Sequence, residues 1–278
     1  MEIIVSLFGG MECGLVAIKQ MGIKCDKYIS SEIEKAPIKV AMKNHPEIIQ
    51  VGDVTKWMEW SVDWSKVDHI QAGSPCQGFS RMGKRLAFDD PRSKLFFVFV
   101  EIYEHVKKLN PNVTFLLENV NMKKEYLDII TNTLGVIPVC INSSLVSAQN
   151  RKRWYWTNIP NVTIPEDRGI TFDSIIPGAV SAGLRGRYIK GSGKKWTRTL
   201  STRTDNKSNC LVTGVSSTGL YVKDNDLKTI TVEEAEKLQT LPVGYTDVDG
   251  VSKTAKYKMI GNGWTVEVIK HIYKGLLK

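Results

Sequence analysis

The chain of 278 residues is long enough for one large domain, or for one domain with a small second one. Hydrophobic residues make up 42% of it and charged residues 24%, which is ordinary for a globular protein and excludes collagen-like, low-complexity and disordered chains. The 38 Lys and Arg residues outnumber the 29 Asp and Glu residues, and the formal net charge of +9 is a weak indication of a polyanionic partner.

The five cysteines are scattered along the chain and form no C-x-x-C pair. An odd, dispersed set argues against a disulfide framework and against a structural zinc site, so we expect a reduced, intracellular compartment and no metal. The N-terminal apolar run is too short and too acidic for a signal peptide. No stretch of the sequence approaches the roughly 18 apolar residues that a membrane span requires. The sequence therefore predicts a soluble, cytoplasmic protein without membrane contact.

The first 160 residues alternate short apolar runs with helical patterns. Strands are predicted at residues 3–8, 24–30, 48–51, 67–72 and 113–117. Helices are predicted at residues 14–21, 36–44 and 94–109. Because strand–helix alternation requires right-handed crossovers, the pattern predicts an α/β fold, a parallel sheet with helices on both faces.

The composition changes after about residue 158. Residues 181–207 contain eight basic residues against one acid, Asp205, with four glycines and two aromatic residues among them. Such a stretch is typical either of a solvated loop or of a nucleic-acid-binding segment, with cations for the phosphates and a flexible backbone to follow a groove. Helices are predicted at residues 232–238 and 266–277, which would return the chain to the first domain.

Three features at the ends of the first three strands are typical of a nucleotide-like ligand. Residues 7–14 (LFGGMECG) form a glycine-rich turn that lets a ligand approach the backbone before an electropositive helix N-terminus. Glu32 follows the second strand, where a carboxylate can accept hydrogen bonds from both ribose hydroxyls of an adenosine-containing ligand. Asp53 follows the third strand and can accept a bond from an adenine amino group. Either acid taken alone more often caps a helix or a turn. Two acids at the ends of successive strands favour the ligand site.

The sharpest feature, residues 73–80 (GSPCQGFS), directly follows the fourth strand. A cysteine in an open turn at the end of a strand, here Cys76, is placed as a nucleophile rather than as a core residue. Glu118 ends the next apolar strand with a carboxylate. Arg151 and Arg153 precede an aromatic strand, and their alternation predicts that they point to one face. Ion pairs along a strand are the alternative interpretation of these arginines.

Taken in order, these blocks resemble the motif series of the DNA (cytosine-5) methyltransferases. The glycine turn, the two strand-end acids, Pro-Cys-Gln, Glu-Asn-Val and Gln-x-Arg-x-Arg all occur in the family order. Residues 198–203 and 256–268 resemble the two last motifs, so the resemblance covers almost the whole chain. The details are most similar to the catalytic domain of the eukaryotic de novo enzymes, and the chain looks like a stand-alone unit of prokaryotic or phage type.

The resemblance implies a Rossmann-like fold that binds S-adenosyl-L-methionine. It assigns residues 1–160 to the catalytic domain, 161–230 to a small basic target-recognition region, and 231–278 to a segment returning to the catalytic domain. Contacts to the cofactor are implied for Phe8, Gly9, Gly10, Met11, Glu12, Cys13, Glu32, Asp53, Val54, Pro75, Asn262, Gly263 and Trp264. Glu12 stands where the commoner bacterial pattern has glycine, a departure shared in kind by the de novo enzymes.

The same resemblance implies methylation of carbon 5 of cytosine in double-stranded DNA. Cys76 would add to carbon 6, Glu118 would hold ring N3 and the exocyclic amine, and Arg153 with Arg151 would contact the carbonyl or a phosphate. Because a stacked base cannot present both faces, the cytosine must be flipped out of the helix. Contacts to DNA are expected from Arg81, Lys84, Arg85, Lys194, Lys195, Arg198 and Arg203.

Alternatives remain open at this stage. The same chemistry could act on a structured RNA, and a catalytically inactive accessory protein could bind DNA, although the inactive protein is expected to lack Cys76 or Glu118. Arg203 is expected to contact either guanine O6 and N7 or a phosphate. Double-stranded DNA is the expected partner, with a restriction endonuclease acting independently as a companion. The expected location is the cytoplasm, at the nucleoid of a prokaryotic or phage-infected cell, and the target sequence and oligomeric state are left open.

Overall fold

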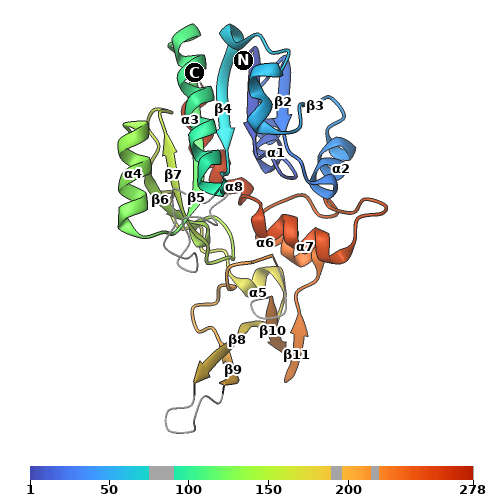
Figure 1. Cartoon of the computed structure of the whole chain (residues 1–278). Helices are drawn as coiled ribbons and strands as arrows, with labels where there is room; N and C mark the ends of the chain where they lie inside the picture. Colours follow the sequence, from blue (N-terminus) through green and yellow to red (C-terminus); the bar gives the residue numbers. More distant parts are fainter. Residues whose placement is uncertain (75–90, 189–195, 214–218, 278) are drawn as a thin grey trace. The chain divides into compact units, whose positions relative to one another are not determined.

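The computed structural model describes residues 1–74, 91–188, 196–213 and 219–277 (Figure 1). The chain divides into two compact units. Unit 1 comprises Met1–Ile141, Lys152–Ile164 and Val268–Lys278, and unit 2 comprises Asn142–Arg151 and Pro165–Glu267. Of residues 231–278, which the sequence predicts to return to the first domain, Val268–Lys278 belong to unit 1 and the others to unit 2.

Unit 1 is built on a seven-stranded sheet with the order β3-β2-β1-β4-β5-β7-β6. The strands are β1 (Ile3–Leu7), β2 (Lys27–Ser31), β3 (Ile49–Gln50), β4 (Val67–Ala72), β5 (Thr114–Val120), β6 (Val139–Asn142) and β7 (Lys152–Thr157). The pairs from β3 across to β5 are parallel, as predicted, but β7 runs antiparallel to β5. The connection from β6 to β7 contains no crossover helix, and such short connections join antiparallel rather than parallel strands.

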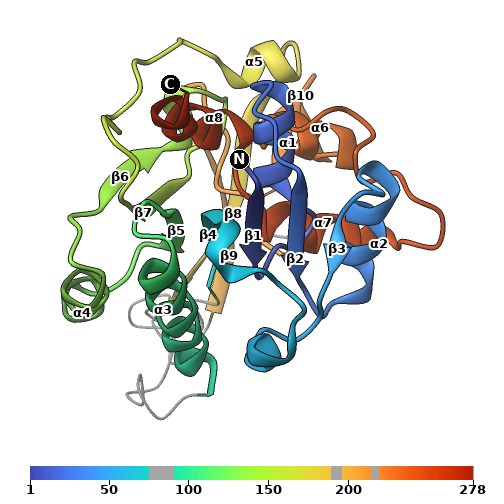
Figure 2. The same cartoon turned by 90° about the horizontal axis from the view of Figure 1, so that it is seen from above.

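Helices cover both faces of this sheet, as the sequence predicted. The helices of unit 1 are α1 (Cys13–Gln20), α2 (Lys35–Asn44), α3 (Pro91–Leu109), α4 (Lys124–Leu134) and the greater part of α8 (Val266–Tyr273). Figure 2 shows α3 and α4 on one face and α1 and α8 on the other. The described residues of this unit also form the short 3-10 segments η1 (Val54–Glu59), η2 (Trp64–Lys66) and η4 (Lys274–Leu276).

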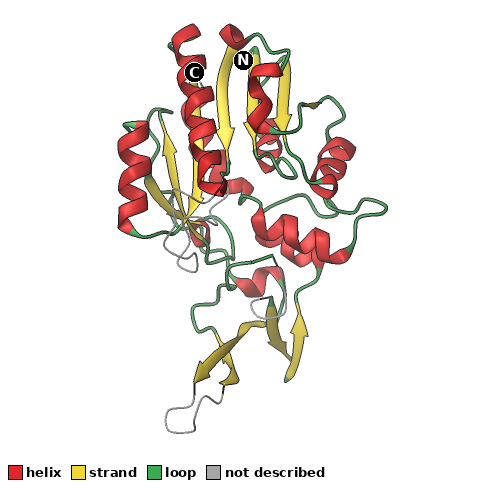
Figure 3. Cartoon of the chain, viewed as in Figure 1, coloured by secondary structure: helices red, strands yellow, loops and turns green. Residues whose placement is uncertain are grey.

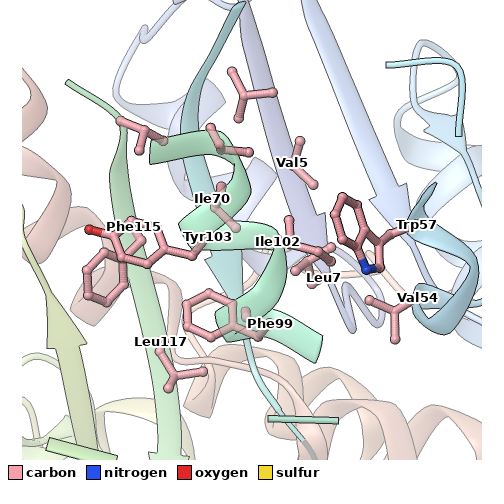
Figure 4. Close-up of a cluster of buried hydrophobic side chains, with 14 of the residues drawn as sticks. Val5, Leu7, Val54, Trp57, Ile70, Phe99, Ile102, Tyr103, Phe115 and Leu117 are labelled. Carbon is pink, nitrogen blue, oxygen red and sulfur yellow. The ribbon is translucent and has the colours of Figure 1, made fainter. Parts of the chain in front are cut away.

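The main core lies between the sheet and α3. Phe99, Ile102 and Tyr103 are spaced so that they share one face of α3, and all three are buried (Figure 4). The ring of Tyr103 packs against Phe115 of β5 with centroids 4.6 Å apart. Because side chains alternate along a strand, Ile70 of β4 joins this core while its neighbours in the strand face α1 and α8.

Unit 2 contains a four-stranded antiparallel sheet, and Figure 3 shows its strands in yellow. The order β11-β10-β8-β9 comprises β8 (Val180–Tyr188), β9 (Trp196–Thr202), β10 (Leu220–Lys223) and β11 (Asp226–Thr229). The turn between β10 and β11 uses Asp224 and Asn225, both with left-handed φ, which suits a two-residue hairpin. The remaining elements are η3 (Ser143–Leu145), α5 (Phe172–Ile175), α6 (Val232–Leu238) and α7 (Lys253–Asn262).

Candidate active site

The glycine-rich turn follows β1 at the edge of the sheet where the parallel strands end. Its backbone is unusual, because Phe8 (φ 57°), Gly10 (φ 57°) and Glu12 (φ 65°) all adopt the left-handed conformation. The Gly9 N–H donates to the Ser31 carbonyl of β2 over 3.1 Å, which fixes the turn to the neighbouring strand. Left-handed φ in two non-glycine residues costs on the order of 1–2 kcal/mol for each, so this turn needs contacts that hold it.

Glu32 lies directly beside this turn. Its Oε2 accepts a hydrogen bond from the Gly10 N–H at 2.9 Å, and its Oε1 accepts from the N–H groups of Ile33 at 2.7 Å and Glu34 at 2.8 Å. Three backbone donors therefore fix the carboxylate in place. The structure brings together two elements that the sequence placed in one ligand site, the turn and the acid at the end of β2.

Asp53 and Val54 follow β3 at the same edge. The Asp53 side chain caps η1, where its Oδ1 accepts from the Thr55 N–H at 2.9 Å and from the Thr55 hydroxyl at 2.8 Å. These two donors hold the pKa of Asp53 below its ordinary value. Val54 is buried. Asp53 thus has the capping role that was the alternative interpretation of this residue. A contact between Asp53 and an adenine amino group stays a prediction.

The other predicted cofactor residues of the turn have buried side chains. Met11, Glu12 and Cys13 are 1%, 0% and 4% exposed, so a ligand on the surface of the turn would meet their backbone rather than their side chains. Phe8, Gly9 and Gly10 are partly exposed. Burial raises the pKa of Glu12, whose carboxylate bonds to groups of β1 and β2.

Glu118 and Arg153 form an ion pair at the end of β5. Leu117 pairs with Ala72 of β4, so Glu118 lies just beyond the level at which β4 ends. The Nε atom of Arg153, which projects from β7, lies 3.0 Å from Oε1 of Glu118. The side chains are only 13% and 10% exposed, so water screens their attraction little. A carboxylate held by a guanidinium can accept hydrogen bonds from the edge of a ligand that carries N–H groups.

Asn119 is a residue of this site that the sequence analysis did not single out. Its Nδ2 donates to the Ser74 hydroxyl at 3.2 Å, and both side chains are buried. Ser74 directly precedes the Pro75–Cys76 motif, so this bond ties the chain entering the motif to the strand that carries Glu118. A buried asparagine at the end of an apolar strand is the signal that could have identified it.

Several predicted site residues lie outside the described part of the chain. These are Pro75, Cys76, Arg81, Lys84, Arg85, Lys194 and Lys195. Arg198 lies in β9, but its side chain is outside the described residues.

Arg151 directly precedes β7 and belongs to unit 2, whereas Arg153 lies within β7 in unit 1. Arg151 is 2% exposed, and its guanidinium donates to the backbone carbonyls of Leu211 at 3.1 Å, Gly261 at 3.1 Å and Gly263 at 2.9 Å. It thus holds together three stretches of unit 2, and its contact with the substrate stays a prediction.

The predicted cofactor residues of the last motif follow α7 in unit 2. Asn262 is exposed, whereas Gly263 and Trp264 are half-buried. The preceding Gly261 lies so close to the backbone of Val212 that an added Cβ would be 2.4 Å from its carbonyl carbon. This motif therefore requires glycine at position 261 for packing within unit 2.

Arg203 is engaged within its own loop. Its Nε donates to Oδ1 of Asp205 at 2.8 Å, its Nη2 bonds Oδ2 of the same residue, and its Nη1 donates to Asn209 at 3.3 Å. The ion pair holds the pKa of Asp205 below its ordinary value. The structure thus gives Arg203 protein partners, and a contact with guanine or phosphate would have to replace or share them.

Within the part of the chain that the structure describes, no group of three or more His, Cys, Asp or Glu side chains is arranged to hold a metal ion. None of the helices in this part combines the length and apolar character needed to cross a membrane.

A mostly parallel sheet covered on both faces, with a glycine turn and acids at its carboxyl edge, defines an α/β fold of methyltransferase architecture. The family model of the C-5 cytosine-specific DNA methylases matches residues 3–176 and 166–278. The chain therefore belongs to this family and is a DNA (cytosine-5-)-methyltransferase. The family to which the sequence motifs pointed is confirmed.

Individual relatives agree with this assignment. The type II methyltransferase M1.ScrFI of Lactococcus lactis subsp. cremoris is 30% identical over 92% of this chain and 73% of its own length. The type II methyltransferase M.NgoBV of Neisseria gonorrhoeae is 33% identical over 55% of this chain and 40% of its own length. Among solved structures, a DNMT2 variant of Spodoptera frugiperda superimposes over the whole of both chains with a TM-score of 0.70 at 19% identity, a likeness of fold.

Proposed function

We propose that this enzyme transfers a methyl group from S-adenosylmethionine to carbon 5 of a flipped-out cytosine in double-stranded DNA, through a transient bond between the base and Cys76. The observation that carries the proposal is the Glu118–Arg153 ion pair. It lies at the end of β5, beside the end of β4, from which the chain runs directly into the Pro75–Cys76 motif.

Glu118 is suited to bind the cytosine ring. Its carboxylate can accept a hydrogen bond from the exocyclic amine and, in the protonated form, donate one to ring N3. Arg153 holds this carboxylate in place and offers further N–H donors for the carbonyl oxygen of the base. The bonds donated to ring N3 and to the carbonyl oxygen strengthen as negative charge develops on the ring, which is the condition for acceleration.

The reaction requires a nucleophile because carbon 5 of cytosine is too electron-poor to take a methyl group directly. The Cys76 thiolate adds to carbon 6, and the electron pair of the double bond moves toward carbon 5. Carbon 5 would then take the methyl group as the methyl–sulfur bond of the donor breaks, with S-adenosyl-L-homocysteine as the leaving group. Loss of the carbon-5 proton to a base restores the double bond and expels the thiolate. A base in the stacked helix cannot offer both of its faces, which is why the cytosine must leave the helix.

The carboxyl edge of unit 1 fits S-adenosylmethionine, which supplies an electrophilic methyl group when bound. Glu32 offers a fixed carboxylate for ribose hydroxyls, and Asp53 offers an acceptor near the expected adenine. The backbone of the turn at residues 8–10 is open to a ligand. Asn262, Gly263 and Trp264 are proposed to complete the cofactor site.

We assign DNA binding to the basic residues of the chain. The loop after Cys76 and the segment 181–207 carry most of the candidate phosphate contacts, and residues 161–230 are proposed to recognise the target sequence. No contact with a metal or a membrane is part of this proposal. The proposed site of action is the DNA of a prokaryotic or phage-infected cell, where a companion restriction endonuclease would act independently.

The test is covalent trapping. Duplex DNA that carries 5-fluorocytosine at the target position cannot lose the proton from carbon 5, so with the methyl donor the adduct at Cys76 should persist through denaturing electrophoresis. The target sequence is first identified by bisulfite sequencing of DNA from cells that express the protein. A Cys76→Ala variant serves as control and should form no adduct.

Two outcomes would contradict the proposal. If the wild-type protein methylates DNA without a trappable adduct at Cys76, the covalent mechanism is excluded. If radioactive methyl groups enter structured RNA but not duplex DNA, the substrate assignment is excluded while the chemistry is retained.

A further inference from the structure

Glu12 lies on the buried side of the glycine turn, opposite the side open to a ligand. Its carboxylate accepts three hydrogen bonds from side chains of two strands. Oε2 accepts from the hydroxyls of Ser6 on β1 at 2.9 Å and Tyr28 on β2 at 2.6 Å, and Oε1 accepts from Ser30 on β2 at 2.5 Å. All four residues are at most 2% exposed.

The surrounding amides orient these hydroxyls toward Glu12. Gln71 of β4 donates through Nε2 to the oxygens of Ser6 at 3.1 Å and Tyr28 at 2.7 Å. Gln50 donates to the oxygen of Ser30 at 3.2 Å. Because each hydroxyl oxygen already accepts an amide N–H, its own proton is left to point at Glu12. This buried network is therefore built around an acceptor at position 12.

The turn itself is shaped around this carboxylate. A Cβ atom on Gly9 would lie 1.9 Å from Oε1 of Glu12, so position 9 must be glycine as long as Glu12 keeps this place. Glu12 also adopts a left-handed φ of 65°, which its side-chain bonds must compensate. Burial raises the pKa of Glu12, so the three donors also offset the cost of removing a carboxylate from water.

The exposed side of the same turn is held by a second carboxylate. Gly10, next to the residue that packs on Glu12, donates its N–H to Glu32. The backbone of residues 9–10 thus lies between Glu12, which is tied to the interior, and Glu32, which belongs to the ligand edge. A shift of Glu12 would be transmitted to the position of Gly10 and hence to Glu32.

We propose that Glu12 is a positioning residue of the cofactor site: bonded to β1 and β2 from the buried side, it fixes the turn at residues 8–12 in the conformation that receives the methyl donor. This inference rests on the proposed function. It differs from a direct contact with the cofactor, because the side chain has no exposed surface. It also differs from a purely structural role, because the strained backbone that it fixes belongs to the ligand site.

The experiment compares substitutions at Glu12 by two readouts on the full-length protein. The affinity for S-adenosyl-L-homocysteine is measured by calorimetry, and amide hydrogen exchange of residues 8–14 is measured without ligand. Glu12→Ala should weaken binding by about tenfold to a hundredfold, because hydrogen bonds to a charged group are lost. It should also accelerate exchange in the turn. Glu12→Gln should lose less affinity, since its carbonyl oxygen can still accept from Ser6 and Tyr28.

Glu236 of unit 2 provides a matched control. It is also 0% exposed and accepts three hydrogen bonds, from the Gly244 N–H at 2.7 Å, the Thr246 N–H at 2.7 Å and the Thr246 hydroxyl at 2.6 Å. Glu236→Ala should lower the melting temperature as Glu12→Ala does, but leave both the affinity and the exchange of residues 8–14 unchanged. Should Glu12→Ala fail to fold, Ser30→Ala removes one of the three donors and should weaken binding by a smaller factor in the same direction.

The outcomes separate this inference from the proposed function. Wild-type affinity in folded Glu12→Ala, or equal losses in Glu12→Ala and Glu236→Ala, would overturn the positioning role. If the wild-type protein itself binds no S-adenosyl-L-homocysteine, the proposal that it uses S-adenosylmethionine as methyl donor is contradicted. The exchange measurement then still decides whether Glu12 holds the turn.

Discussion

The two units bury their charged side chains in different ways. In unit 1, the buried carboxylates meet other side chains: Glu118 pairs with Arg153, and Glu12 bonds three hydroxyls. In unit 2, charged groups bind the backbone. Arg151 donates to three carbonyls. Lys207 donates to the carbonyls of Ser144 at 2.7 Å and Ile170 at 2.5 Å, among others. Glu236 accepts from two backbone N–H groups.

Regular structure explains the difference. The central strands of the sheet in unit 1 satisfy their own N–H and C=O groups, so polar side chains at the sheet edge remain available to one another and to a ligand. Unit 2 has long irregular segments whose buried carbonyls need other donors, and charged side chains supply them. A buried charge in unit 2 is therefore expected to serve stability, and a buried charge at the edge of unit 1 to serve chemistry.

Arg151→Ala offers the strongest test of this contrast. Three carbonyls lose a bond from a buried charged donor, so we expect the free energy of unfolding to fall by about 3–6 kcal/mol, measured by urea denaturation. Arg168 is the matched control, because its ion pair with Glu267 is solvent-exposed and its loss should cost less than about 1 kcal/mol. If both variants were equally stable, Arg151 would not be a structural residue.

Glu118→Gln tests the other side of the comparison. The amide keeps the size of the carboxylate but loses its charge, and methyl transfer should slow by about 100- to 1000-fold in single-turnover experiments. DNA affinity, measured by gel shift, should change little. The control Glu125→Gln alters an exposed carboxylate that pairs with Lys123 on the surface, and its rate should equal that of the wild type. A parallel loss of DNA affinity would argue that Glu118 serves binding instead.

His69 makes the stability of unit 1 depend on pH. It is fully buried between Thr114 and Tyr273, and burial lowers its pKa to about 3. Between about pH 6.5 and pH 3 the unfolded chain therefore binds a proton that the folded protein excludes, so stability is lost as the pH falls. The expected loss is about 1.4 kcal/mol for each pH unit below 6.5, or about 2 kcal/mol at pH 5.

Urea unfolding at pH 7 and pH 5 measures this effect. His69→Gln has no proton to gain, so its stability should fall less between the two pH values than that of the wild type. If both proteins lost the same free energy of unfolding between pH 7 and pH 5, burial would not prevent His69 from binding a proton in the folded state.

The smallest effect is expected from the double variant Lys194→Gln, Lys195→Gln. DNA binding should weaken on all sequences alike, by about tenfold or about 1.4 kcal/mol, because phosphate contacts carry no sequence information. The slope of log affinity against log salt should flatten by about 2. The same two-charge change at Lys123 and Lys124, which form ion pairs on unit 1, should leave the slope unaltered. A changed target sequence would contradict the phosphate role.

The sequence predicted unit 1 better than unit 2, and the reason lies in periodicity. Residues 67–72 form β4 with the predicted bounds, and Gly73 follows directly. The four strands of unit 2 were not predicted, since glycines and cations interrupt the alternation in β8 and β9. Within unit 1, α4 and β6 were also missed, although α4 carries Tyr126, Leu127, Ile130 and Leu134 at helical spacing.

The candidate site shows the same limit. Glu32 and the glycine turn could be predicted to lie together because parallel strands end at one edge. The partners of Arg151 could not be predicted, since they lie far along the chain and are brought close only by the folding of unit 2. Those of Arg203 are near in sequence, but no periodic pattern in this loop indicates the bonds to Asp205 and Asn209. Local pattern identified which residues are charged and where strands end, but not which groups those charges bind.

The close approach of Gly9 to Glu12 restricts the order in which the turn can evolve. A side chain at position 9 would occupy the space of the Glu12 carboxylate, whereas a small residue at position 12 would vacate that space. Substitution at 12 must therefore precede substitution at 9, and the reverse path passes through an intermediate with a steric clash. Ancestral reconstructions or combinatorial libraries of this turn should show strong epistasis between the two positions, and a library that varies position 9 alone should yield glycine.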